Sequence, residues 1–114
     1  METNILDLEN DIKMIAVNGK IDTSTSSILE GSLLEIINSG SSKILIDFKN
    51  VNYISSAGLR VLLATAKKCK NQNKEFKVCS LNEVTKEIFE ISGFITILSV
   101  YSSKEEAISS FKQG

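Results

Sequence analysis

The 114-residue sequence contains no histidine, and this absence excludes several classes of function. A serine–histidine–acid triad cannot be built without histidine, so hydrolases of that kind are excluded. Metal sites that depend on imidazole ligands are excluded for the same reason. The serines of this chain therefore need an explanation other than triad chemistry.

Cysteine is scarce, and proline is absent. Cys69 and Cys79 are ten residues apart, whereas metal sites use closer pairs and usually add histidine. A disulfide would require an oxidising compartment. We therefore expect both cysteines to be buried thiols.

The sequence also lacks an excess of charge of one sign and any long apolar run. It has 13 basic and 14 acidic residues, a net charge of −1, which gives no basic field for nucleic acid or an anionic membrane. Neither a transmembrane span nor a signal peptide is visible, so we expect a cytoplasmic protein without direct membrane insertion. The length predicts one domain, residues 1–114.

Apolar segments typical of strands alternate with segments of helical periodicity. Strands are expected at residues 4–8, from Ile12 to a turn at Asn18–Gly19, at 43–48, at 76–81 and at 95–101. Helices are expected over 29–37, over 59–66, over 84–91 between an Asn82 cap and Gly93, and over 107–111 after a Ser103–Glu106 capping box. The alternation predicts an α/β fold with a mixed, mostly parallel sheet of four to five strands and about four helices. The leading strands are expected to pair antiparallel at one edge.

The stretch "YISSAGLR", residues 53–60, joins a predicted strand to a predicted helix. Such a loop lies at the carboxyl end of the strand, where open α/β sheets place functional groups. Ser55 or Ser56 is the predicted N-cap, and Gly58 is interpreted as keeping the first turn bare for a large partner. The exposed amides of that turn favour an anion. Two interpretations stay open: the serines only cap the helix, or one of them carries a phosphate.

Three segments resemble the STAS domain family of bacterial anti-sigma factor antagonists. "VNGKID" (17–22) is similar to the family's turn before the first helix. "LIDFKNVNYISSAGLRVLL" (45–63) is similar to its long strand–loop–helix signature, and "EIFEISGF" (87–94) to the end of its third helix. The three segments occur in the family's order and together span nearly the whole chain.

The resemblance implies a switch protein that is not itself an enzyme and needs no cofactor or metal. In family antagonists, a serine two positions before the signature glycine is phosphorylated by an anti-sigma factor that is a serine kinase. That position is Ser56 here. The unphosphorylated form binds the anti-sigma factor and releases the sigma factor, and a PP2C-type phosphatase resets the phosphorylated form. The implied partner-binding residues are Asp22, Thr23, Ser55, Ser56, Ala57, Gly58 and Arg60.

One residue departs from the family pattern. Many antagonists have an aspartate immediately before the phosphorylated serine, and this chain has Ser55. The acceptor hydroxyl is retained, but a second hydroxyl is added, so Ser55 is the second candidate for phosphorylation.

Three other functions are alternatives to the phosphorylation switch. The same fold can serve as a docking subunit of a lipid-transport ATPase or a stress-sensing assembly, without phosphorylation. A receiver-like phosphoacceptor would use Asp47, which ends a predicted strand, but companion Mg²⁺-binding carboxylates are not found after the strand that begins at Ile12. An enzyme with a serine nucleophile lacks an obvious base, since Lys67 and Lys68 are expected to form a solvated face.

Overall fold

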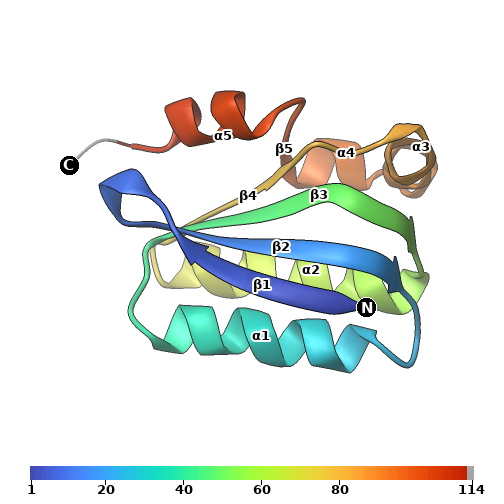
Figure 1. Ribbon diagram of the computed structural model, residues 1–114, viewed down its shortest axis with the longest axis horizontal. Coiled ribbons are helices and arrows are strands. Elements are labelled where there is room, and N and C mark those ends of the chain that lie inside the picture. The colour runs from blue at the N-terminus through green and yellow to red at the C-terminus, as the bar shows by residue number, and fades with distance from the viewer. Residues whose placement is uncertain (113–114) are drawn as a thin grey trace.

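A computed structural model describes residues 1–112, whose core is a five-stranded sheet in the order β1-β2-β3-β4-β5 (Figure 1). The strands are β1 (Glu2–Asp7), β2 (Ile12–Ile21), β3 (Lys43–Ile54), β4 (Glu75–Cys79) and β5 (Ser99–Tyr101). β1 pairs antiparallel with β2, and the other three pairings are parallel. The predicted α/β class and mixed, mostly parallel sheet are confirmed, including the antiparallel edge. Residues 113 and 114 of the predicted domain lie outside the described residues.

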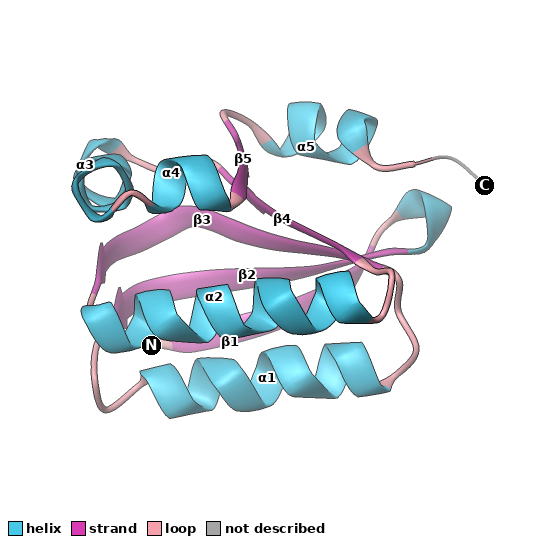
Figure 2. Cartoon of the chain, turned by 180° about the vertical axis from the view of Figure 1, so that it is seen from behind, coloured by secondary structure: helices cyan, strands magenta, loops and turns pink. Residues whose placement is uncertain are grey.

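Helices cover both faces of this sheet (Figure 2). These helices are α1 (Ser26–Asn38), α2 (Ser56–Asn71), α3 (Glu83–Ser92), α4 (Phe94–Ile97) and α5 (Lys104–Ser110), and a short 3-10 helix, η1 (Glu9–Asp11), joins β1 to β2. α1 and α2 lie side by side against one face, whereas α5 lies against the other. Within residues 1–112, none of these helices is long and apolar enough to cross a membrane.

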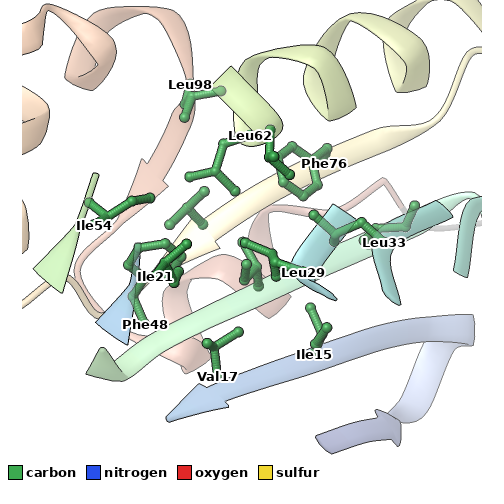
Figure 3. Close-up of a cluster of buried hydrophobic side chains, with 14 of the residues drawn as sticks. Ile15, Val17, Ile21, Leu29, Leu33, Phe48, Ile54, Leu62, Phe76 and Leu98 are labelled. Atoms are coloured by element: carbon green, nitrogen blue, oxygen red, sulfur yellow. The ribbon is translucent and has the colours of Figure 1, made fainter. Parts of the chain in front are cut away.

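The sheet separates a large hydrophobic core from a small one. Ile44, Ile46 and Phe48 of β3 belong to the large core under α1 and α2, part of which Figure 3 shows. Leu45 belongs to the small core under α5. Because both faces of β3 are covered, its beginning is a continuous apolar run rather than an alternating one.

The predicted turn at Asn18–Gly19 is wrong, because β2 continues to Ile21. The pairing with β3 shifts register before Asn18 and after Gly19, and Gly19 has φ of +103°. The Asn–Gly pair therefore forms an irregularity inside the strand. Pairing with β1 on one side and β3 on the other outweighs the local preference for a turn.

β3 is also longer than predicted. Residues 49–54 were expected to form a loop, but they remain in the strand and pair with β2 up to Ile54. Asp47 consequently lies inside β3 and not at its end, where its Oδ1 accepts a hydrogen bond from the Lys49 N–H at 2.9 Å. The receiver-like interpretation loses the strand-end aspartate on which it was based.

The strand predicted at 95–101 is half wrong. Residues 94–97 form α4, and only Ser99–Tyr101 form β5.

The capping box predicted before α5 is also incomplete. Ser103 Oγ accepts from the Glu106 N–H at 3.1 Å, but the Glu106 carboxylate accepts from the Ser102 hydroxyl at 2.8 Å.

The predicted Asn82 cap and Gly93 end of α3 are confirmed. Asn82 Oδ1 accepts from the Thr85 N–H at 2.9 Å, and Gly93 is left-handed with φ of +81°. Asn82 Nδ2 also donates to the Val51 carbonyl at 2.6 Å, which fastens the start of α3 to β3. The apolar face is displaced from the prediction, since Phe89 is buried whereas Val84 and Ile91 are exposed.

Replacing Asn82 with alanine is expected to lower the free energy of unfolding by about 1 kcal/mol, because the helix loses its cap. Urea denaturation followed by circular dichroism measures this difference. Ser103→Ala, at the more exposed cap of α5, is the comparison and is expected to cost less. An Asn82→Ala variant as stable as the parent would contradict the capping role.

Cys69 and Cys79 are buried free thiols, as predicted. Burial raises the pKa of both, and that of Cys79 to about 11. Because the thiolate is the reacting form and the two side chains are only 1% and 0% exposed, the native protein is expected to resist iodoacetamide at pH 8. Mass spectrometry of the alkylated protein measures this, with urea-unfolded protein as the labelled control. Rapid alkylation of either thiol in the native state would contradict it.

Candidate phosphoacceptor site

Two segments that are distant in the sequence meet at the carboxyl edge of the sheet. The last residues of β2 and β3, Ile21 and Ile54, are paired. The chain leaves β2 at Asp22 and β3 at Ser55, and the Ser55 N–H donates to the Ile21 carbonyl at 2.8 Å. The starts of α1, α2 and α3 gather at this same end of the molecule (Figure 1). The fold thus brings together the two loops that were predicted to form one surface.

Ser55 is the N-cap of α2. Its backbone is extended, with φ of −85° and ψ of 171°, and its Oγ accepts from the Gly58 N–H at 3.2 Å. The residue is half-buried. The capping interpretation of the serine pair therefore applies to Ser55, whose hydroxyl already has a structural partner.

Ser56 is the first residue of α2, and its side chain is exposed. Within residues 1–112 its hydroxyl makes no hydrogen bond, and the amides of Ser56 and Ala57 also have no acceptor. Unpaired amides at a helix start carry the positive end of the helix dipole. The hydroxyl of Ser56 is therefore free for chemistry at a position that favours negative charge.

Gly58 has a different role from the one predicted. It is buried, and a Cβ at this position would lie 2.7 Å from Ile21 Cγ2 and 2.7 Å from Ile54 Cγ1. The missing side chain lets α2 pack against the ends of β2 and β3. Gly58 thus serves the packing of the core beneath the loop and does not present a bare surface to a partner.

Asp22 organises the turn that leads into α1. Its Oδ1 accepts from the Ser24 hydroxyl at 2.7 Å, from the Ser24 N–H at 3.0 Å and from the Thr25 N–H at 2.9 Å. These hydrogen bonds, led by that of the Ser24 hydroxyl, lower the pKa of the Asp22 carboxyl. The carboxylate therefore stays ionised to a lower pH than an ordinary aspartate and contributes negative charge to this edge.

The remaining predicted partner-binding residues flank these loops. Thr23 is exposed, and its carbonyl accepts from the Ser26 hydroxyl at 3.1 Å. Ala57 is half-buried in the first turn of α2. Arg60 is exposed in that helix and makes no ion pair within the described chain.

The sequence did not point to three exposed apolar side chains at this end of the sheet. Ile28, Tyr53 and Val84 have exposed fractions of 55%, 43% and 53%. Ile28 and Val84 lie in the first turns of α1 and α3, and Tyr53 is the second-to-last residue of β3. Tyr53 belongs to a segment that was expected to be a loop, and Val84 to a helix face that was expected to be buried. The exposure of these side chains is therefore evident only in the structure.

The arrangement combines a free hydroxyl, an electropositive helix start and exposed apolar side chains. No basic side chain hydrogen-bonds the Ser56 hydroxyl within residues 1–112. Such a hydroxyl is suited to accept a group from another protein's active site.

The sequence of this chain is similar to those of known proteins. The model of the STAS domain family matches residues 5–107. BtrV of Bordetella bronchiseptica, named as an anti-sigma factor antagonist, is 34% identical over 107 residues, which cover 94% of this chain and 92% of that protein. The anti-sigma-B factor antagonist of Bacillus subtilis is 30% identical over 100 residues, covering 88% and 90%.

Solved structures share the fold. An anti-sigma factor antagonist from Mycobacterium paratuberculosis superposes with a TM-score of 0.88 at 23% identity, covering 96% of this chain and 92% of that one. SpoIIAA of Bacillus in its phosphorylated form superposes with a TM-score of 0.72 at 16% identity, covering 95% and 97%. At these identities the likeness concerns the fold alone.

Proposed function

This chain belongs to the STAS domain family, and we propose that it acts there as an anti-sigma factor antagonist switched by phosphorylation of Ser56. The unphosphorylated form binds an anti-sigma factor that is a serine kinase, and the sigma factor is released. The phosphorylated form dissociates, and a PP2C-type phosphatase restores the binding form. The observation that carries this proposal is the exposed hydroxyl of Ser56 at the start of α2, which has no hydrogen-bond partner within residues 1–112.

The names of the relatives support the proposal. Both sequence relatives described above are named anti-sigma factor antagonists and align over nearly their whole lengths. The structure of SpoIIAA in a phosphorylated form supports a phosphorylation switch on this fold.

The geometry favours Ser56 over Ser55 as the acceptor. Ser55 Oγ accepts the capping hydrogen bond from the Gly58 N–H, so a phosphate on Ser55 would disturb the helix start. A phosphate on Ser56 leaves that cap intact. It also places negative charge beside the amides of the first turn, which favour it.

The switch then needs no refolding. Phosphorylation adds about −1.5 to −2 charges at pH 7. A partner that covers this edge would have to bury that charge close to the ionised Asp22 carboxylate. The phosphate therefore does not destabilise α2 in the free protein, but it weakens the complex with the partner.

Phosphorylation with a cognate anti-sigma kinase, ATP and Mg²⁺, followed by tandem mass spectrometry, tests the proposal. We expect phosphate on Ser56 of the parent protein. The Ser56→Ala variant should carry no phosphate at this site, and the Ser55→Ala variant should still be phosphorylated. Phosphate on Ser55 alone, or on neither serine, would overturn the assignment. A stable complex with a transport ATPase that is unaffected by Ser56→Ala would instead favour the docking-subunit function.

A further inference from the structure

A groove of about 750 Å³ lies along the C-terminal half of α2, away from Ser56. It follows the outer edge of β4. β5 pairs only with Lys77–Cys79, so Glu75 and Phe76 have no strand on that side. α2 forms one wall of the groove, and the segment Ile97–Ser99 forms the other.

The floor of this groove is apolar. It is lined by Leu63 and Ala66 of α2, by Phe76 of β4 and by Leu98. Phe76 and Leu98 are anchored in the large core and are only 8% and 6% exposed. Ile97 stands at the rim, with 58% of its surface exposed.

The lining of the groove is rich in lysine. Of the 13 basic residues of the chain, one is arginine and 12 are lysines. Six of these lysines line this one groove, together with a single acidic residue, Glu75. They are Lys43, Lys67, Lys70, Lys74, Lys77 and Lys112. Half of the lysines of this protein, whose net charge is −1, thus line one groove.

Three of these lysines are held by the protein itself. Lys43 Nζ donates to the Asn10 carbonyl at 3.2 Å, and Lys74 Nζ to the Ser41 carbonyl at 2.6 Å. Lys77 Nζ is buried and donates to Ser110 Oγ at 2.8 Å.

The other three lysines, Lys67, Lys70 and Lys112, have ammonium groups without an ion pair or hydrogen bond in the described chain. Glu75 forms its ion pair with Lys77, whose Nζ lies 3.7 Å from the carboxylate, and one negative charge cannot balance the three remaining ammonium groups. The groove therefore carries uncompensated positive charge above an apolar floor.

We propose that this groove binds a small anionic amphiphile, a molecule with an apolar chain or ring and one phosphate or carboxylate group. The apolar part would cover Phe76, Leu98 and Ile97, and the anionic group would lie between the ammonium groups of Lys67 and Lys70. A hollow lined by charge of one sign concentrates ligands of the opposite sign, and an apolar floor adds affinity for the chain. The site is separate from Ser56 and does not depend on the proposed phosphorylation.

Titration of the ¹⁵N-labelled protein with dodecyl phosphate, below its micelle concentration, tests this proposal. Saturable shifts are expected at the amides of Leu63, Ala66, Phe76 and Ser99. Inorganic phosphate should bind more weakly, since it lacks the chain, and dodecyltrimethylammonium should not bind at all. Higher salt should weaken the binding of dodecyl phosphate.

Matched variants separate the site from general charge effects. Lys67→Glu with Lys70→Glu is expected to weaken dodecyl phosphate binding at least about tenfold, because two attractive charges become repulsive. Lys68→Glu with Lys86→Glu makes the same change in net charge at exposed lysines outside the groove and should leave affinity within about twofold. Ile97→Ser should weaken dodecyl phosphate but not inorganic phosphate.

Any one of three titration results would overturn the proposal: equal weakening by the two double variants, equal binding of the anionic and cationic amphiphiles, or absence of saturable shifts at the groove. Binding to phosphatidylglycerol vesicles without any binding of monomeric dodecyl phosphate would also overturn it, since the surface would then serve a bilayer.

Discussion

Replacing Ser56 with aspartate is expected to weaken the complex with a cognate anti-sigma factor by about 30-fold or more. Introducing an unmatched charge into a close polar contact of an interface costs about 2–5 kcal/mol. At about 1.4 kcal/mol per factor of ten, this corresponds to a loss of about 30-fold to several thousand-fold. Phosphorylation adds more charge than aspartate does, so its effect should lie above that of Ser56→Asp. Isothermal titration of the purified partners measures both.

Two neutral variants identify the cause of the loss. Ser56→Asn has nearly the size of Ser56→Asp without its charge and should bind far more tightly than the aspartate variant. Ser56→Ala should bind like the unphosphorylated parent and remain bound in the presence of ATP. If Ser56→Asn bound as weakly as Ser56→Asp, bulk rather than charge would be responsible and the electrostatic mechanism would be wrong.

Stability measurements on the same variants exclude unfolding as the explanation. An aspartate at the first position of α2 lies near the positive end of the helix dipole. Ser56→Asp should therefore unfold at the same urea concentration as the parent or a slightly higher one. Weak binding by a fully stable protein would locate the effect at the interface.

The sequence predicted most reliably those elements whose local signals agree with their surroundings. The run at 43–48 is apolar because β3 is covered on both faces, so its composition and its burial point the same way. Asn82 and Gly93 mark the ends of α3 because a cap and a left-handed residue act within one helical turn. Such features need no information from distant parts of the chain.

The sequence failed where distant pairing overrides a local preference. Asn18–Gly19 is a strong turn signal, yet β1 and β3 hold it inside a strand from both sides. The polar residues 49–54 look like a loop, and only their pairing with β2 keeps them extended. The prediction for residues 94–97 failed without any distant pairing, because their strand-like composition did not reveal that they form a helical turn directly after Gly93.

The sequence predicted which loop would form the candidate site, but it did not separate the roles of the residues within that loop. Local physics left Ser55 and Ser56 as alternative caps, and the resemblance alone favoured Ser56 as the acceptor. The structure shows that Ser55 holds the cap and that the Ser56 hydroxyl has no hydrogen-bond partner within residues 1–112. Gly58 was interpreted as an opening for a partner, because a missing side chain looks the same in sequence whether it faces solvent or core. Its packing against Ile21 and Ile54 depends on the relative placement of three elements.

Gly58→Ala is expected to lower the free energy of unfolding by about 2 kcal/mol. The new Cβ would lie 2.7 Å from carbon atoms of both Ile21 and Ile54, which are themselves 0% and 1% exposed and have little room to move. Overpacking of this kind costs about 1–3 kcal/mol, and a cost at the upper end would exceed the gain of about 1 kcal/mol in helix propensity. Urea denaturation measures the difference.

Gly31→Ala provides the matched control, because the substitution is the same and the surroundings are opposite. Gly31 lies inside α1, is exposed, and a Cβ there would meet nothing within 4 Å. Only the helix propensity changes, so this variant should be more stable than the parent by about 1 kcal/mol. The two alanines should thus shift stability in opposite directions. If Gly58→Ala were stabilising as well, α2 would not pack closely on the ends of β2 and β3, and the position of Ser56 above them would have to be revised.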